Sequence, residues 1–248
     1  TEYARQEAAA GDLWPLSGRM FMEIAPEEPF RYFMDWLRPG SLTLVFAPGG
    51  KGKSVFAIDL LDSLHCGVQF LGRDISAVVQ NSLLVDGEMP LWLIKKRLDG
   101  KSPEMIDGLG IITKETHSGL SLVDSEGQDE FLRMLDEFLP QIVVFDNKVT
   151  LWPMEDENAV AEWATIMEFL ARIRARDIAV ILIHHANKSG GARGSSAALD
   201  LCDTAVELKA EDDGVLTVHF PKHRLGSTPA PIEVEIENDV MGLRLVAR

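Results

Sequence analysis

Cysteine is scarce in this sequence, and no stretch of it is apolar enough to span a lipid bilayer. Only two cysteines occur in the 248 residues, Cys66 and Cys202, and their positions form no paired spacing. A disulfide framework and a thiolate metal site are therefore not expected. No apolar run approaches the roughly 18 residues that cross a membrane, and residues 1–11 lack the apolar segment of a signal peptide. These absences predict a cytoplasmic protein without a membrane partner.

Positive charge is also in short supply. The chain has 24 lysine and arginine residues against 39 aspartate and glutamate residues, which gives a formal net charge of −15. A field of this sign repels nucleic acid and excludes a protein that coats DNA over a broad surface. Any contact with nucleic acid must therefore come from local basic loops. Apolar residues make up 46% and charged residues 25% of the chain, as in an ordinary globular protein.

The chain divides near the turn formed by Pro39 and Gly40. Residues 1–37 combine an Ala-rich start, several prolines and an amphipathic stretch over residues 30–37. We expect them to form an N-terminal arm that packs either on the core or on a neighbouring subunit. No internal repeat or low-complexity segment follows, so residues 38–248 are expected to form one domain.

Apolar strands and helices alternate from residue 41 onward, which is typical of a parallel sheet with crossover helices. Strands are expected at 41–46, 82–86, 109–113, 141–146 and 178–184, and helices from the loop after the first strand to about 65, then at 91–98, 129–139 and 159–175. Short strands at 204–208, 215–220, 232–236 and 243–246 follow, and their close spacing predicts antiparallel pairing. The sequence thus predicts an α/β fold with a mostly parallel central sheet, flanked by helices and extended by antiparallel C-terminal strands.

A glycine-rich loop joins the first strand to the first helix. Its residues are Pro48, Gly49, Gly50, Lys51, Gly52, Lys53, Ser54 and Val55. Glycines allow backbone N–H groups to face phosphates, and the helix N-terminus adds its dipole. Lys53 is expected to reach the β- and γ-phosphate oxygens, and the Ser54 hydroxyl to ligate Mg²⁺. ATP and Mg²⁺ are therefore the expected cofactors, although Ala47 stands where the usual pattern has glycine.

Two acids follow buried strands at the same expected edge of the sheet. Asp146 ends the apolar run of residues 142–145, and its position beside the glycine loop would let it hold the water shell of Mg²⁺. Hydrolysis also needs a carboxylate that orients and deprotonates the attacking water. Asn147 cannot act as a base, so Glu88 is the candidate. The alternative for Glu88 is an acid that only favours a helix N-terminus.

Five segments, taken in order, resemble RepA-type plasmid replicative helicases and related ATPases of phages and mobile elements. They are DGEMP (86–90), VVFDN (143–147), HHANKSG (184–190), RGSSAALDLCDTAVEL (193–208) and PKHRLG (221–226). The last two also resemble, more distantly, the DnaB-type helicases. The resemblance covers roughly residues 38–230 and implies a RecA-like P-loop ATPase that forms a ring of six subunits, with ATP sites between neighbours.

The resemblance also implies a phosphate sensor and a DNA loop. In RecA-like ATPases a polar residue at the end of the fifth strand contacts the γ-phosphate, and we take His185 as the candidate ahead of His184. These proteins place a DNA-contacting loop directly afterwards, which here is the polar segment 186–196 with Lys188 and Arg193. Single-stranded DNA is therefore an expected partner. The alternative is a surface loop without a function.

A basic residue from the neighbouring subunit completes the ATP site in such rings. Lys222 and Arg224 match the Lys-x-Arg finger of DnaB-type enzymes, and Arg193 is the alternative from the RepA-type segment. The order among the three stays open. The basic residues of 95–97, and Arg172, Arg174 and Arg176, are expected to lie on solvated helix faces.

The leading hypothesis is an ATP-hydrolysing, ring-forming DNA helicase or translocase of RepA type that serves replication of a plasmid, phage or mobile element. One alternative is a recombinase-like or repair ATPase that acts on single-stranded DNA without unwinding it. A further alternative is an adaptor in which bound ATP only fixes a conformation.

Overall fold

The computed structural model describes residues 17–24, 32–153, 160–186, 199–211, 215–239 and 242–248. Contacts divide the chain into two units, Thr1–Phe30 and Arg31–Arg248. The described part of the first unit is a short helix, α2 (Gly18–Ile24), at whose start the Ser17 hydroxyl accepts a hydrogen bond from the Met20 N–H. Phe21 and Met22 on this helix are exposed to solvent.

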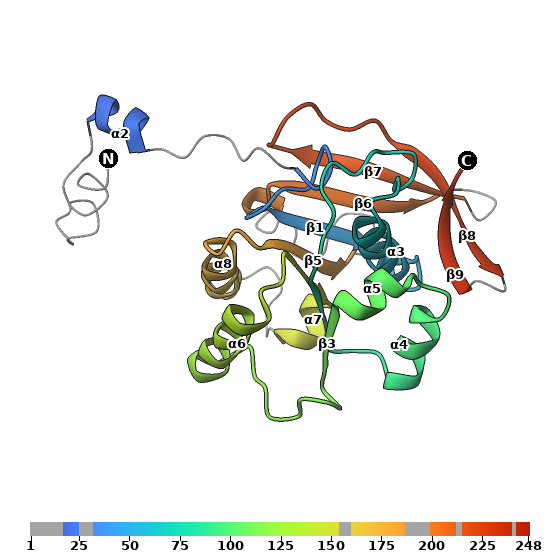
Figure 1. Cartoon of the computed structure of the whole chain (residues 1–248), viewed down its shortest axis with the longest axis horizontal. Helices are drawn as coiled ribbons and strands as arrows, with labels where there is room; N and C mark the ends of the chain where they lie inside the picture. The colour runs from blue at the N-terminus through green and yellow to red at the C-terminus, as the bar shows by residue number, and fades with distance from the viewer. Residues whose placement is uncertain (1–16, 25–31, 154–159, 187–198, 212–214, 240–241) are drawn as a thin grey trace. The chain divides into compact units, whose positions relative to one another are not determined.

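A nine-stranded sheet of order β3-β2-β4-β5-β1-β6-β7-β8-β9 forms the centre of the second unit (Figure 1). The strands are β1 (Leu42–Ala47), β2 (Ser82–Asp86), β3 (Leu109–Thr113), β4 (Ile142–Asp146), β5 (Ala179–His185), β6 (Thr204–Ala210), β7 (Leu216–His223), β8 (Ile232–Asp239) and β9 (Gly242–Ala247). Pairing is parallel from β3 to β6 and antiparallel from β6 to β9. The predicted fold class is confirmed.

The helices of the second unit that lie wholly within the described residues are α3 (Lys53–Cys66), α4 (Leu91–Leu98), α5 (Pro103–Gly108), α6 (Ser125–Phe138), α7 (Lys148–Leu151) and α8 (Val160–Arg174). Helix α6 begins four residues before the predicted start, because the Asp124 side chain caps it by accepting from the Gly127 N–H. Helices α5 and α7 were not predicted, since one or two turns are too short to show helical periodicity. No helix among the described residues is long and apolar enough to cross a membrane.

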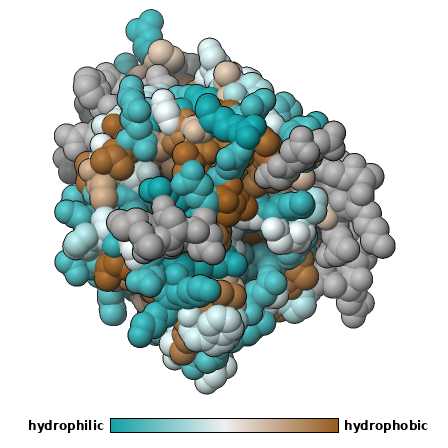
Figure 2. Space-filling model, turned by 90° about the vertical axis from the view of Figure 1, so that its right-hand side faces the viewer, coloured by the Kyte–Doolittle hydropathy of each residue, from teal (hydrophilic) through white to brown (hydrophobic). Residues whose placement is uncertain are grey.

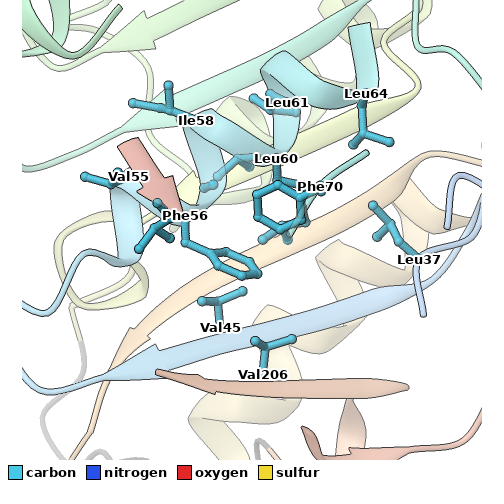
Figure 3. Packing of buried hydrophobic residues seen from close by; sticks show 14 of the residues in the cluster. Leu37, Val45, Val55, Phe56, Ile58, Leu60, Leu61, Leu64, Phe70 and Val206 are labelled. Atoms are coloured by element: carbon cyan, nitrogen blue, oxygen red, sulfur yellow. The ribbon is translucent and has the colours of Figure 1, made fainter. Parts of the chain in front are cut away.

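Two apolar clusters cover the two faces of the sheet. One joins α3 to residues from alternate positions of β1, β4 and β5, and Figure 3 shows Phe56 of α3 between Phe70 and Val45. The other joins α6 and α8 to the opposite face, as their positions in Figure 1 indicate. Phe33, Trp36 and Leu37, from the segment predicted as the end of the arm, are buried in the first cluster.

The C-terminal hairpin β8–β9 is tied to the helix that follows the glycine loop. The Asp59 carboxylate on α3 accepts a hydrogen bond from the Leu245 N–H on β9 at 2.6 Å, and it pairs with the Lys101 ammonium at 2.5 Å. Both charged side chains are less than a tenth exposed. In Figure 2 apolar side chains reach the surface between hydrophilic ones; Ile236 of this hairpin is among the exposed apolar residues.

Candidate active site

The carboxyl ends of four parallel strands bring the candidate site residues together. Asp86 at the end of β2 is in register with Asp146 at the end of β4. Ala47 at the end of β1, directly before the glycine loop, is in register with His185 at the end of β5. Parallel strands end at one edge of a sheet, which is where ligands bind in open α/β folds. A cavity of about 320 Å³ opens at this edge.

The glycine loop forms one wall of this cavity, from Gly50 to Val55. Gly50 and Gly52 both have a positive φ, of 71° and 78°, a backbone conformation that side chains other than glycine rarely adopt. A side chain at Gly50 would point into open space, whereas one at Gly52 would meet the Ile236 side chain at 2.8 Å. Pro48 and Gly49 are exposed at the start of the loop.

The Lys53 ammonium is held by backbone carbonyl groups at the start of the glycine loop. It donates to the carbonyl oxygens of Ala47 and Pro48, each at 3.0 Å, and lies 3.3 Å from Nδ1 of His185. Burial lowers the pKa of Lys53, and the nearby carboxylates of Asp146 and Glu88 oppose this shift. The Lys53 ammonium is thus partly shielded from water, and a phosphate bound beside it would interact with its charge strongly.

Asp146 is the buried acid of the site. Burial raises its pKa to about 6; a hydrogen bond from Ser54 lowers the pKa, and the neighbouring Asp86 carboxylate raises it. The outer oxygen Oδ2 of Asp146 is buried without a hydrogen-bond partner among the described residues. A carboxylate that carries a free buried oxygen beside a serine hydroxyl fits the partial ligand set of Mg²⁺, which takes its remaining ligands from phosphate and water. Ser54 and Asp146 would therefore hold the ion.

Glu88 stands on a turn that Asp86 shapes. One oxygen of the Asp86 carboxylate accepts from the backbone N–H groups of Glu88 at 2.8 Å and Met89 at 2.6 Å. The Glu88 side chain is about half exposed, and its Oε2 lies 3.8 Å from Nε2 of His185. It also accepts a hydrogen bond from the Asn147 side chain. A carboxylate that is fixed at one oxygen and open to solvent can accept a proton from a water molecule.

Five residues that line the cavity were not predicted as site residues: Met89, Arg97, Asn147, Ile236 and Leu243. Arg97, which was expected on a solvated face of α4, lines the cavity instead. Burial raises the pKa values of Asp86 and Asp146, and the Arg97 charge opposes part of that rise. Ile236 and Leu243 reach the cavity from the hairpin β8–β9. Arg97 is three residues after the buried Ile94, so both lie on the same side of α4, and this spacing could have indicated that Arg97 faces the protein. No local signal places the hairpin residues there.

The two histidines of β5 face opposite ways, as expected for neighbouring strand residues. His185 lines the cavity, whereas His184 is fully buried on the other face with its ring 5.6 Å from that of Trp163. The structure therefore brings only His185 to the candidate site.

The candidate finger residues lie elsewhere in the same chain. His223, between Lys222 and Arg224, pairs with Thr204, and Thr204 is aligned with Thr43 near the start of β1. The glycine loop follows the other end of β1, roughly 13 Å further along the strand. The Lys222 ammonium donates to the Leu199 carbonyl oxygen and the Arg224 guanidinium to that of Asp200, at 2.8 Å. Lys188, Arg193 and the rest of the predicted DNA loop after Ala186 lie outside the described residues.

Comparisons with known proteins agree with this fold. The AAA_25 family, described as an AAA domain, matches residues 14–191. The DNA repair protein RadA of Haemophilus influenzae is 24% identical over 194 residues, which are 76% of this chain and 37% of that protein. RadA of Mycobacterium tuberculosis is 25% identical over 76% of this chain and 36% of its own length. The chain thus spans about a third of these curated relatives.

Among solved structures, the flagellar accessory protein FlaH from Methanocaldococcus jannaschii superposes with a TM-score of 0.59. The alignment covers 84% of this chain and 90% of that one at 14% identity, so the likeness concerns the fold. Together with the glycine loop and the strand order, these matches identify the chain as an AAA domain with a RecA-like P-loop fold. They do not single out the RepA-type helicases.

Proposed function

We propose that this chain, which belongs to the AAA_25 family of AAA domains, is a ring-forming ATPase that moves along single-stranded DNA as a helicase or translocase of RepA type. The observation that carries the proposal is the position of His185. Its ring lies 3.3 Å from the Lys53 ammonium, and the chain continues from it directly into segment 186–196. A change in the phosphate beside Lys53 would therefore be passed to a segment that holds two cations and no acid.

The proposed chemistry uses groups that already lie around one cavity. Lys53 and the backbone of the glycine loop bind the β- and γ-phosphates, while Ser54 and Asp146 hold Mg²⁺. When bound, the ion neutralises charge that develops on the phosphate oxygens. Glu88 orients the attacking water and accepts its proton. Arg97 faces the same cavity and adds a positive charge within the subunit.

The site is proposed to be completed by a neighbouring copy in a ring of six. Lys222 and Arg224 flank His223 of β7, which lies level with the start of β1 and away from the glycine loop of the same chain, so in the proposed ring they would act on a neighbouring subunit. Arg193 is the third candidate. Segment 186–196 would line the centre of the ring, so that a chain with a net charge of −15 confines its DNA contacts there. A cytoplasmic location is part of this proposal.

The similarity to RadA favours a second candidate function. A protein named for DNA repair matches 76% of this chain, so a repair ATPase that binds single-stranded DNA without unwinding it is the alternative. A strand-displacement assay on a forked duplex separates the two, because both readings expect single-stranded DNA to stimulate ATP hydrolysis. Unwinding supports the helicase, and stimulated hydrolysis without unwinding supports the repair ATPase.

The test of the ring is a mass measurement on the purified chain with a non-hydrolysable ATP analogue, with and without single-stranded DNA. We expect an assembly of six chains that retains DNA, and Lys53→Ala as a control that forms no DNA complex in response to nucleotide. A monomer in all conditions, with hydrolysis that does not respond to DNA, would refute the motor and leave an ATP-dependent adaptor.

A further inference from the structure

Asn147 is a polar residue at the centre of the site, and it is only 1% exposed. It follows Asp146 at the end of β4 and caps the short helix α7. Its side-chain oxygen accepts from the Thr150 N–H at 3.2 Å and lies 3.4 Å from the Thr150 hydroxyl. The helix cap therefore assigns the oxygen and the nitrogen of the side-chain amide. The Nδ2 group, with its two hydrogens, faces the active-site cavity.

The two hydrogens of this amide have two partners. Asn147 Nδ2 donates to Oε2 of Glu88 and lies 3.2 Å from Nε2 of His185. Glu88 has a long side chain that is about half exposed, so it loses conformational freedom when it is held in one orientation. A buried donor on a capped helix can hold it there, because the donor itself is fixed.

We propose that Asn147 is a positioning residue that orients the Glu88 carboxylate toward the attacking water and links it to the phosphate sensor His185. This inference rests on the proposed role of Glu88 as the catalytic base. It assigns the link between sensor and base to one amide group, that of the residue directly after Asp146.

The two neighbours of the His185 ring explain how its contact with Asn147 responds to nucleotide. Its Nδ1 faces the Lys53 ammonium at 3.3 Å, and its Nε2 faces the Asn147 amide at 3.2 Å. Both neighbours are donors, whereas a neutral imidazole accepts at one nitrogen only. The two hydrogen bonds therefore compete. Bound phosphate draws the Lys53 ammonium toward its oxygens, and Nδ1 can then carry the proton while Nε2 accepts from Asn147.

Phosphate thus favours the state in which Asn147 binds His185 and Glu88 together. Without phosphate, Lys53 and Asn147 compete for the same ring, and one of the two contacts weakens. The Glu88 carboxylate is therefore held most firmly in its orientation when a γ-phosphate is bound. Activation of water by Glu88 is then favoured in the site that contains ATP.

The test uses Asn147→Ser and Asn147→Asp. Serine and aspartate cap helices about as well as asparagine does, so both variants keep the cap of α7 and remove the Nδ2 donor. Aspartate also adds a buried carboxylate beside Glu88, so Asn147→Ser is the cleaner variant. We expect kcat for ATP to fall about 10- to 100-fold, the usual effect of losing a hydrogen bond to a charged group. For Asn147→Ser, the affinity for a fluorescent ATP analogue and the thermal midpoint should stay near those of the wild type. Unchanged kcat in both variants would overturn the proposal.

Thr150→Val is the matched control, because it removes the capping hydroxyl but keeps the backbone N–H that orients the amide. We expect it to retain kcat; a loss equal to that of Asn147→Ser would show that the role of Asn147 is only to hold α7. The double variant of Glu88→Gln with Asn147→Ser should turn over no more slowly than Glu88→Gln alone. A further loss would show that Asn147 acts independently of the base and would contradict the proposal.

Glu88→Gln alone distinguishes a failure of Glu88 as the proposed base from a failure of Asn147 as its positioning residue. If it hydrolyses ATP like the wild type, the proposed base is wrong, and the positioning role fails with it. If Glu88→Gln loses turnover while both Asn147 variants keep it, only the positioning role fails.

Discussion

Replacing Asp146 by asparagine should remove hydrolysis and at the same time stabilise the empty protein. The Asp146 side chain is 4% exposed, and its Oδ2 is buried without a hydrogen-bond partner among the described residues. Burial raises its pKa from 3.8 to about 6, so the folded protein disfavours the ionised form. A shift of roughly 2 pKa units corresponds to about 3 kcal/mol of lost stability at neutral pH. A neutral asparagine does not carry this cost, and its oxygen can still accept from Ser54.

The raised pKa of Asp146 also determines how the stability of the wild type changes with pH. The folded state holds the Asp146 proton more tightly than the unfolded state does. Wild-type stability should therefore fall as pH rises from about 4 to about 6 and stay level above that, as far as this group is concerned. The advantage of Asp146→Asn should be absent near pH 4, grow through this window and become constant.

Thermal unfolding in EDTA without nucleotide measures the effect. For a domain of this size, 1 kcal/mol shifts the midpoint by about 2–4 °C, so the variant should melt roughly 6–12 °C higher at pH 7.5. Asp136→Asn is the control, because the exposed Asp136 pairs with Arg176, which lowers the pKa of that carboxyl; it should bring no gain. Equal midpoints of Asp146→Asn and wild type from pH 4 to pH 8 would refute the reasoning.

Three further predictions concern the cavity and its support. Arg97→Ala should lower kcat/KM about tenfold and move the acid limb of the pH–rate profile to higher pH, because the guanidinium lowers the pKa of Asp146; steady-state ATPase assays from pH 5 to pH 8 measure both. Ile236→Ala should raise KM several-fold with little change in kcat, since Ile236 packs on Gly52 of the glycine loop; a titration with a fluorescent ATP analogue tests this. Asp59→Ala should cost about 3–5 kcal/mol in urea unfolding, because it leaves the buried Lys101 ammonium without its partner.

Local patterns in the sequence were sufficient for the sheet and for the groups that end its strands. The apolar runs of β2 and β3 and the helix α4 match the predicted bounds, because each is bounded by a turn residue or a change in periodicity. Glu88, Asp146 and His185 could be placed at one edge because parallel strands end together. Their mutual arrangement depends on the strand order, in which β4 and β5 lie between β2 and β1, and local patterns do not predict that order.

The remaining parts of the site depend on contacts between distant segments. Ile236 lies against Gly52 in a hairpin that the Asp59 carboxylate of α3 binds through the Leu245 N–H, and no local pattern encodes that approach. Asn147 was dismissed because an amide cannot act as a base, although a buried amide can still orient one. The length of α7 is a single turn, so its cap was not recognisable in the sequence.

Hydrolysis by Glu88→Gln, compared with its binding of ATP, shows whether Glu88 is the base of an ATP-hydrolysing site. The variant keeps the size of the side chain and removes its ability to take a proton from water. We expect it to bind a fluorescent ATP analogue with wild-type affinity in the presence of Mg²⁺, and to hydrolyse ATP at least 100-fold more slowly than the wild type, the lower range for loss of a general base. Wild-type turnover by Glu88→Gln would contradict the account.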